Sequence, residues 1–546
     1  MFEPRPLDSR KDHMHMFDAA IAAFREVVGE EHTLTDPVAL ERYGWSTIPV
    51  RRQIAAVLRP ASVEQIQQVV RTAAAHRIAL YPISTGNNWG YGSALPAEDD
   101  NVIVDLSRMN RILEVNAELA YVVLEPGVTQ RQLYEYLQER RIPLWLNPTG
   151  AGPTCSILGN TLERGFGIGP NGDHFLAQCG MEAVLATGEL LQTGFGHYPE
   201  ARATYVYKWG VGPYLDGLFT QSNYGIVTKI GVWLAPEPEH FEACYLSCRT
   251  DGQLGPLIDA VRQLLFTGAF RGPINLLHRN RVLIMLGRYP WQEMAGAEAL
   301  SESVAQEMAA EKQVGAWNGV GAICGTKGQV RAAKQAIKRI LKGKVDRLVF
   351  LSDARLRLLQ RFPKTWSALI RLNVPELLKT LQGSYGLMKG IPSDVALSLA
   401  YWRNRRDPSI DVQINPARDN CGLMWFAPVI PMTARDVFAF RRIIEPILAR
   451  YGFEACLTFT AVNERCFDCT LPLLYDKDNP AEVERALNCY SDLVESCRRD
   501  GFIAYRLGLQ SMRGETARDD VFWNVADTLK RALDPHRILA PGRYAR

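Results

Sequence analysis

Glycine and asparagine are concentrated in one short segment, YPISTGNNWGYG, which runs from Tyr81 to Gly92 and contains no Lys or Arg. Because glycine has no Cβ, such a segment can turn sharply and bring its backbone N–H groups close to a ligand. Clusters of N–H groups bind anions, and phosphate is the usual one. The segment therefore predicts a phosphate-binding loop that acts through peptide dipoles rather than through cationic side chains.

A second region of the same kind, TGAGPTCSILGNTLERGFGIGPNGDH, spans Thr149 to His174. It holds too many turn-forming residues to be a helix or a strand throughout. Two glycine-rich loops in one chain are consistent with a long cofactor that is held at each end by one of them.

One C-x-x-C pair, Cys466 and Cys469, matches half of a metal-binding pattern. A structural zinc site needs four ligands, and no second pair or His cluster has matching spacing. The eleven cysteines are scattered through a large chain, which favours reduced thiols over a disulfide framework. We predict no metal site.

The first loop follows a pattern of alternating elements. QIAAVLRPAS predicts a strand over 53–62, a helix follows with Ser62 and Gln65 as a capping box, and IALYPIS is the next strand. The loop thus lies at the carboxyl end of a strand in a β-α-β unit, where ligands usually bind. The G-x-G-x-x-G turn leading into a helix is missing, which disfavours a nicotinamide-binding Rossmann fold.

Further along, two strands, a Pro-Gly turn and a helix capped by Thr129 are expected, then a hairpin in GMEAVLATGELLQTG and a strand in NYGIVTKIGVWLAPEP. From about His240, helical segments rich in charge alternate with short strands. We expect a first domain over 1–240, a second over 241–499, and a return to the first over 500–546.

Composition limits the class of protein. The 546 residues are 47% hydrophobic and carry a net charge of +3, which favours a multidomain globular enzyme and gives no support for nucleic-acid binding. There is no apolar run of about 18 residues, and the N-terminal segment is charged where a signal peptide would be apolar. Cytoplasmic location is the expectation, and periplasmic export together with a partner stays open.

Several ordered motifs carry a family resemblance, among them YPISTGNNWGYGSALP, ILGNTLERGFGIGPNGDHF, KWGVGPYLDGLFTQSNYGIVTKIGVWL and DPHRILAPGR. With them the chain resembles the family of the p-cresol methylhydroxylase flavoprotein subunit and vanillyl-alcohol oxidase. The resemblance implies an α+β fold, in which an FAD-binding domain of two subdomains carries a mixed α/β cap domain. It also implies FAD-linked oxidation of 4-alkylphenols, and we expect a homodimer.

The resemblance implies that the first loop wraps the FAD pyrophosphate, with Asn87 where the family usually has arginine. Some of the implied cofactor residues are expected to be turn residues without direct contact. The implied set is Pro82, Ile83, Ser84, Thr85, Gly86, Asn87, Asn88, Gly92, Gly159, Asn160, Thr161, Gly165, Gly169, Asp173, Gly225, Ile226, Val227 and Arg543.

The resemblance also implies a substrate site. Tyr91, Tyr505 and Arg506 match the family residues that bind a phenol as phenolate, from which a hydride leaves the para benzylic carbon to give a p-quinone methide. Asp173 is the best candidate for a catalytic carboxylate near the flavin, and the alternative is that it holds the loop by hydrogen bonds. Glu163 and His174 are alternatives for activating water, and both are better explained by structural roles.

Departures from the family matter as well. Ala400 and Leu423 stand where the family has the Tyr or His that links the flavin covalently, with Tyr401 one residue off on a presumed strand, so non-covalent FAD is predicted. Ile168 and Ala396 replace a tyrosine and a glutamate. A late pair of histidines is replaced around Phe467-Asp468.

These features predict an FAD-dependent dehydrogenase or hydroxylase of 4-alkyl or 4-allyl phenols, with a c-type cytochrome or another electron acceptor. Small residues at Gly150 and Ala151 leave oxidase activity open. A non-phenolic substrate in secondary metabolism, or a flavoprotein without turnover, is the alternative.

One basic region has no counterpart in the resemblance. Residues 327–379 contain fourteen Lys and Arg against three Asp and Glu. A solvated helix face is the simpler interpretation. A docking surface for an acidic acceptor protein or an anionic membrane surface is the alternative.

Overall fold

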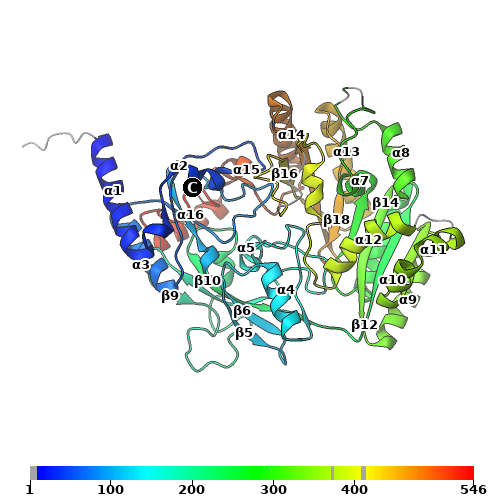
Figure 1. Ribbon diagram of the computed structural model, residues 1–546, viewed down its shortest axis with the longest axis horizontal. Coiled ribbons are helices and arrows are strands. Elements are labelled where there is room, and N and C mark those ends of the chain that lie inside the picture. The colour runs from blue at the N-terminus through cyan, green and yellow to red at the C-terminus, as the bar shows by residue number, and fades with distance from the viewer. Residues whose placement is uncertain (1–8, 295, 297, 371–373, 407–412, 546) are drawn as a thin grey trace, which may run out of the picture.

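The computed structural model describes residues 9–294, 296, 298–370, 374–406 and 413–545. In Figure 1 the blue and cyan N-terminal part, together with the C-terminus, lies beside a second body that contains most of the green and yellow segments. Within the described residues, no helix is both long and apolar enough to cross a membrane.

The first sheet has four strands in the order β1-β2-β4-β3. Both β2 and β3 run parallel to β4, and α3 connects β2 to β3, as the β-α-β pattern predicts. Ser62 caps α3 by accepting the Gln65 N–H at 3.3 Å, although the Gln65 carboxamide accepts from Ala61 rather than from Ser62. The bounds are β1 Thr33–Leu34, β2 Ile54–Leu58, α3 Val63–His76, β3 Leu80–Ile83 and β4 Asn101–Asp105.

The second sheet has five antiparallel strands in the order β5-β6-β10-β8-β9. Its hairpin β8-β9 and the strand β10 agree with the sequence patterns. The short helix α5 forms inside the second glycine-rich region. The bounds are β5 Ile112–Asn116, β6 Tyr121–Leu124, α4 Gln130–Glu139, α5 Ile157–Leu162, β8 Gln178–Val184, β9 Leu190–Gln192 and β10 Ile226–Trp233; β7 Leu144–Trp145 pairs with β11 Ala235–Pro236.

The third sheet, here called the cap sheet, has the order β15-β12-β14-β13-β18-β19-β16, with β17 paired to β19. Helices α6, α9, α13 and α14 cover one of its faces. The strands are β12 His240–Cys248, β13 Ile274–His278, β14 Trp317–Gly325, β15 Arg347–Leu351, β16 Gly422–Phe426, β17 Val429–Pro431, β18 Thr458–Ala461 and β19 Cys466–Tyr475. The helices are α6 Leu254–Phe266, α9 Lys327–Leu341, α13 Ala434–Arg450 and α14 Pro480–Arg499.

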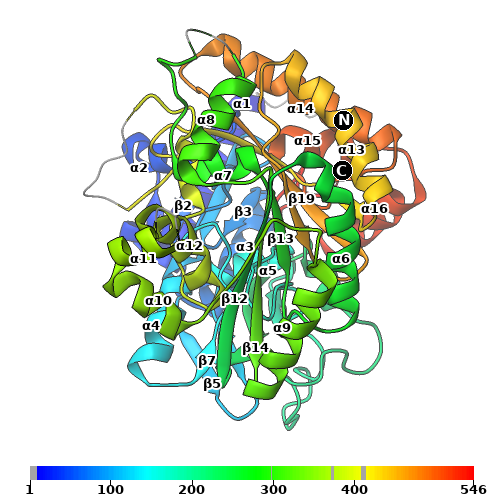
Figure 2. The same ribbon diagram turned by 90° about the vertical axis from the view of Figure 1, so that its right-hand side faces the viewer.

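Alternation along β12 separates two cores. Cys244 and Leu246 face the helices α6 and α9, whereas Ala243 and Tyr245 face the other side, where α10 and α12 pack. Figure 2 shows α9 and α10 on opposite sides of β12 and β14. The helices of the basic region 327–379, of which 371–373 lie outside the described residues, are therefore divided between the two faces of the cap sheet.

The remaining helices complete the two bodies. They are α1 Ser9–Val28, α2 Pro37–Glu41, α7 Arg279–Leu286, α8 Glu302–Lys312, α10 Asp353–Arg361, α11 Pro363–Ile370, α12 Val374–Met388, α15 Leu509–Thr516 and α16 Val521–Leu533. Among them, α1 packs along α3 at the outer edge of the first body.

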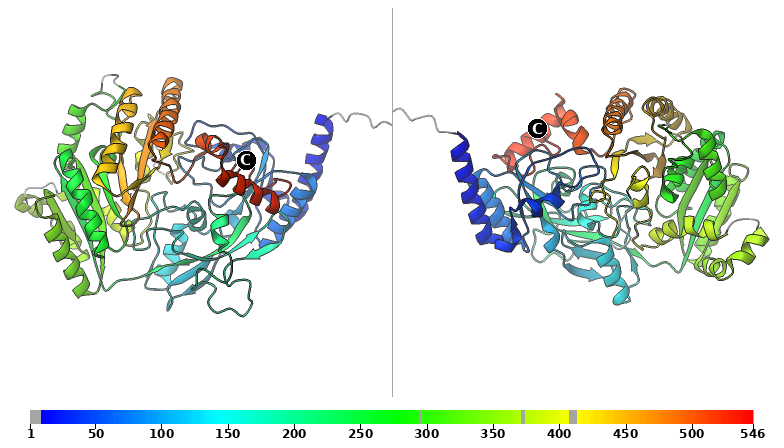
Figure 3. Two further views of the ribbon diagram at one scale, coloured as in Figure 1. Left: turned by 180° about the vertical axis from the view of Figure 1, so that it is seen from behind. Right: turned by 45° about the horizontal axis from the view of Figure 1, so that its top comes forward.

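After α14 the chain crosses from the second body back to the first. Tyr505 N–H donates to Ala427 O at 3.0 Å and Val429 N–H to Ile503 O at 3.0 Å, so the chain continues the cap sheet pairing after α14. It then returns to the first body, where Ala540 N–H donates to Leu80 O at 2.7 Å. In both views of Figure 3 the red C-terminal segment lies toward the blue N-terminal side.

Candidate active site

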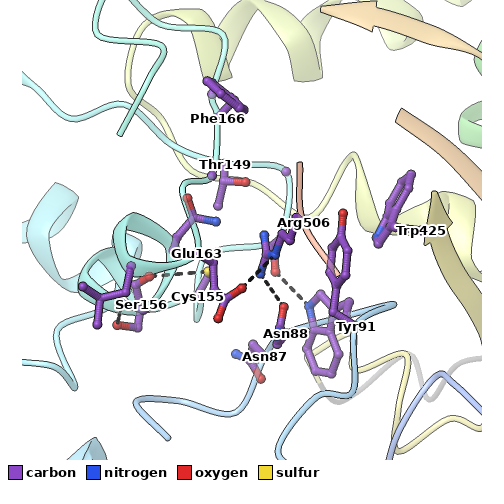
Figure 4. A pocket seen from close by; sticks show the side chains of 18 of the residues that line it. Asn87, Asn88, Tyr91, Thr149, Cys155, Ser156, Glu163, Phe166, Trp425 and Arg506 are labelled. Carbon is purple, nitrogen blue, oxygen red and sulfur yellow. Dashed lines mark hydrogen bonds and ion pairs between the residues drawn. The ribbon is translucent and has the colours of Figure 1, made fainter. Parts of the chain in front are cut away.

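A cavity of about 430 Å³ is lined by both bodies. From the first body come the loop after β3, the helix α5 and the C-terminal tail. From the second come the cap strands β13, β18 and β19 and the segment 395–400. Figure 4 shows part of the lining from close by.

The first glycine-rich loop contributes an unbroken stretch of this lining, Tyr81 to Trp89. Gly86 has φ +70°, a conformation that favours glycine. Within the described part of the chain, the N–H groups of Thr85, Gly86 and Asn87 donate no hydrogen bond, so they are available to an anion. The Asn87 amide instead donates to Thr154 O at 3.1 Å and ties the two loops together.

The helix α5 is positioned by buried hydrogen bonds. Ser156 caps it by accepting the Gly159 N–H at 2.9 Å, and its hydroxyl donates to Pro126 O at 2.6 Å. A Cβ on Gly159 would lie 2.3 Å from Ser84 Oγ. Glycine therefore lets α5 approach the first loop closely, and the two together form one wall.

The predicted cofactor residues divide into two groups. Beyond the loop, the cavity is also lined by Gly159, Asn160, Gly165, Gly225, Val227 and Arg543. Five predicted residues do not line it, namely Gly92, Thr161, Gly169, Asp173 and Ile226. Strand alternation explains Ile226, which points into the core of the first sheet while Val227 faces the other way.

Asp173, expected in the catalytic set, does not line the cavity. Its carboxylate accepts the Leu176 N–H at 2.9 Å and Phe166 and Asp173 form an isolated bridge, so it holds the loop. His174 is also internal to that region: its Nδ1 shares a hydrogen bond with Asn160 Oδ1, and burial lowers its pKa to about 4. Neither side chain faces the large cavity.

The three residues expected at the phenol site do meet in the cavity. The Arg506 guanidinium carbon lies 4.2 Å from the centroid of the Tyr91 ring, and the Tyr505 ring packs edge-on against Phe166 at 5.6 Å. Figure 4 shows the Arg506 side chain pointing toward Asn88 and Glu163, with Tyr91 beside it. Burial raises the pKa of both tyrosine hydroxyls, so both stay protonated and can donate hydrogen bonds.

Glu163 links two cations at the edge of this cluster. Its carboxylate lies 3.1 Å from Arg506 Nε and also pairs with Arg543. Arg543 in turn donates to the Tyr81 hydroxyl at 2.9 Å. Glu163 therefore connects the segment around Arg506, which follows the cap sheet, to the C-terminal tail at Arg543. Because its carboxylate is already paired with two cations, Glu163 is poorly suited to activating water.

Asp468 is the carboxylate that sequence reasoning did not assign. It lies on β19, is 3% exposed, and lines the cavity with Thr470, while its two neighbours in the strand, Phe467 and Cys469, point into the core. Burial raises the pKa of Asp468 to about 7, an effect that Arg506 partly offsets. Period-two alternation from the buried Phe467 could have indicated its direction.

The alternation also separates Cys466 from Cys469, since only Cys469 lies in the core. No group of three or more His, Cys, Asp or Glu that could hold a metal occurs among the described residues.

The positions considered for a covalent flavin link are well defined. Ala400 and Leu423 line the cavity. The segment Leu397–Tyr401 is a 3-10 helix rather than the expected strand, and the Tyr401 hydroxyl donates to Asp419 at 2.6 Å, away from the lining. Cys155 lines the cavity, but burial raises the pKa of its thiol to about 12.

The donor set fits FAD. A cavity with unpaired backbone N–H groups at one wall, the close approach of α5 at Gly159, and Arg543 at the tail suits an anionic dinucleotide. The opposite end, lined by the cap sheet, remains for a smaller ligand.

Comparisons with known proteins agree. The FAD binding domain model matches residues 54–194. A 1'-carboxy-chondrochloren decarboxylase from Chondromyces crocatus is 39% identical over 96% of this chain and 97% of its own length. A 4-cresol dehydrogenase [hydroxylating] flavoprotein subunit from Pseudomonas putida is 31% identical, over 96% of this chain and 95% of its own.

Solved structures give the same answer. A substrate-bound p-cresol methylhydroxylase has a TM-score of 0.87 and 30% identity, and the isoeugenol complex of 4-ethylphenol oxidase from Gulosibacter chungangensis has 0.85 and 27%; each match covers 97% of both chains. The predicted α+β fold and the FAD cofactor are confirmed. The chain therefore belongs to the p-cresol methylhydroxylase and vanillyl-alcohol oxidase family of FAD-dependent oxidoreductases.

Proposed function

We propose that this protein oxidises para-substituted phenols at the benzylic carbon. The observation that carries the proposal is a cluster in the cavity lining of one buried guanidinium, Arg506, and two protonated tyrosine hydroxyls, those of the buried Tyr91 and the half-buried Tyr505. One cation and two hydroxyl donors that line the same cavity suit an aromatic oxyanion.

In this proposal the residues of the chain prepare the substrate. Tyr91 and Tyr505 donate hydrogen bonds to the oxygen of the substrate's phenol group. The positive charge of Arg506 lowers the pKa of that phenol group. Asp468, ionised above about pH 7, takes up the phenol proton. The resulting phenolate pushes electron density toward the para carbon and makes loss of a hydride from the benzylic carbon easier.

When bound, FAD supplies the two-electron acceptor for that hydride. The loop Pro82–Asn88, Asn160 and Arg543 would hold it. We predict that it is bound without a covalent link. The final electron acceptor, a c-type cytochrome, another protein or oxygen, belongs to the same proposal.

The product depends on the fate of the p-quinone methide. Water addition gives a benzylic alcohol, and proton loss from the side chain gives an alkene. The 39% identical relative is named a decarboxylase of a carboxylated compound, which favours a second candidate. If the carbon next to the benzylic carbon carries a carboxylate, its C–C bond breaks, CO2 leaves, and the electron pair forms the alkene and restores the phenolate.

The test is anaerobic mixing of the purified flavoprotein with 4-alkyl, 4-allyl and carboxylated 4-alkyl phenols, followed by flavin absorbance and product analysis. Rapid bleaching is expected, and air or a cytochrome then identifies the acceptor. If dithionite reduces the flavin and no phenol does, the phenol proposal is wrong. A non-phenolic substrate, or a flavoprotein without turnover, then takes its place.

A further inference from the structure

A second arginine, Arg281, lines the cavity and has no role in the phenol site. It belongs to the first turn of α7, directly after β13. Its Nε donates to Thr458 Oγ1 at 2.9 Å, and its guanidinium carbon lies 5.4 Å from the centroid of the Trp425 ring. The side chain is 8% exposed, and its Nη1 has no hydrogen-bond partner among the described residues.

The charge of Arg281 is not compensated. Among the described residues no carboxylate pairs with it, and it occupies the positive end of a helix. Burial lowers its pKa to about 10, so it remains a cation at neutral pH. An unpaired buried charge is costly, which is why such groups normally have a counter-ion.

Two other arginines of the same body, Arg403 and Arg279, do have carboxylate counter-ions. Arg403 is 2% exposed and pairs with both Glu454 and Glu482, at 2.8 and 2.9 Å. Arg279, two residues before Arg281, pairs with Glu302 at 2.6 Å on the outside of the fold. Arg281 thus differs from both: it is buried, faces the cavity, and lacks a protein carboxylate.

A chain of contacts connects Arg281 to the phenol site. Trp425 packs against Gly90 so tightly that a Cβ on Gly90 would lie 2.3 Å from the indole. The next residue is Tyr91, and Figure 4 shows Tyr91 between Arg506 and Trp425. A ligand whose phenol lies at Arg506 could therefore extend along Tyr91 and Trp425 toward Arg281.

We propose that Arg281, with Thr458 beside it, binds a carboxylate on the side chain of the substrate, which is therefore a 4-hydroxyphenyl compound carrying an acid group. This inference rests on the proposed phenol oxidation. The carboxylate supplies the counter-ion that the protein lacks, and two of its contacts are the Arg281 Nη1 donor and the Thr458 hydroxyl.

The test uses a pair of probes that the enzyme cannot oxidise: 4-hydroxyphenoxyacetate and its amide, in which oxygen replaces the benzylic carbon. Binding to the holoenzyme is measured by calorimetry and by the shift in flavin absorbance. The wild type should bind the acid at least tenfold more tightly than the amide. Arg281→Met should bring the two affinities within twofold of each other without weakening the amide, and Arg281→Lys should keep part of the preference.

Arg279→Met is the matched control, because it removes a cation from the same helix turn outside the cavity; it should keep the wild-type preference. Without ligand, Arg281→Met should have a Tm equal to or above that of the wild type, since it removes an uncompensated buried charge. Equal affinity of the wild type for acid and amide, or an unchanged preference in Arg281→Met, would overturn the proposal.

A separate measurement keeps the two proposals apart. If 4-ethylphenol bleaches the flavin and the acid preference is missing, the phenol oxidation stands and the anion site is wrong. If the acid preference is present and no phenol bleaches the flavin, the anion site stands and the phenol oxidation is wrong.

Discussion

At the scale of single residues, burial sets the protonation states that the proposed chemistry needs. Tyr91 and Tyr505 remain donors because burial raises their pKa values, while Arg506 supplies the charge. Asp468 lies within electrostatic reach of all three. The residues therefore act as one cluster, in which removing any member changes the others.

Tyr505→Phe removes one donor to the proposed phenolate. A hydrogen bond to a charged group is worth about 1.5–3 kcal/mol, so flavin bleaching by a reactive phenol should slow about 10- to 150-fold. Stopped-flow absorbance under anaerobic conditions measures it. Tyr490→Phe is the control, since Tyr490 is buried, lies outside the cavity lining and shares a hydrogen bond with Ser511; equal effects of the two variants would contradict the assignment.

Asp468→Asn tests the proton acceptor. Because burial raises the pKa of Asp468 to about 7, the carboxyl is protonated and inactive below that pH, and wild-type bleaching should accelerate as pH rises through about 7. Flavin bleaching in the Asn variant should be slow and should not accelerate as the pH rises through about 7. Asp216→Asn, which changes a buried carboxylate bonded to Gln178, should keep the wild-type profile.

The same shift predicts an effect on stability. The folded-state pKa of Asp468 lies above the ordinary value of about 4, so the stability it contributes is present at low pH and is lost as pH rises to about 7. Relative to Asp468→Asn, the wild type should lose up to about 4 kcal/mol of unfolding free energy over that range. Denaturant unfolding of both proteins at pH 4.5 and pH 8 measures the difference, and parallel pH dependence would contradict the assigned pKa.

At the scale of elements, close approaches of backbone position the site. The loop after β3 is held by the Gly90 N–H, which donates to Thr47 Oγ1 at 2.8 Å, and by the Trp89 indole, which donates to Ala151 O at 3.0 Å. Gly90 also lies against Trp425 of β16. The loop thus joins the first body to the cap sheet at the point where Tyr91 enters the cavity.

Gly90→Ala should disturb that junction. Gly90 has φ +75°, and the added Cβ would lie 2.3 Å from Trp425 Cδ1, so strain and overpacking together should cost about 2–4 kcal/mol and slow flavin bleaching. Gly212→Ala separates the two causes, because Gly212 has φ +85° and open space around it. Similar losses of Tm in both variants would show that the contact with Trp425 is unimportant.

At the scale of the whole molecule, the cavity exists only where distant segments meet. Glu163 joins Arg506 to Arg543, and the tail then pairs with Leu80 of β3. Asp468 and Trp425 of the cap sheet and Arg281 of α7 close the other end. Cofactor and substrate regions are therefore assembled from parts that no single domain contains.

The assembly also predicts how the flavin is held. Ala400 and Leu423 carry no nucleophile, Tyr401 is bonded to Asp419, and the raised pKa of Cys155 keeps its thiol protonated. Acid precipitation should release FAD into the supernatant and leave a polypeptide of unmodified mass. Flavin that stays with the protein would contradict the prediction, and Cys155→Ser and Tyr401→Phe would then identify the link.

The sequence alone determined the local features and the family. The glycine-rich loop, the cap of α3 by Ser62, the β-α-β unit and the β8-β9 hairpin depend on neighbouring residues, and the ordered motifs indicated FAD and the α+β fold. The tertiary structure decided which side chains reach the cavity. Asp173 turned out to hold a loop, Tyr401 pointed away on a 3-10 helix, and Asp468 and Arg281 entered from the cap sheet and α7. Side-chain direction depends on register and on packing between segments hundreds of residues apart, and these are not encoded in any one stretch of the chain.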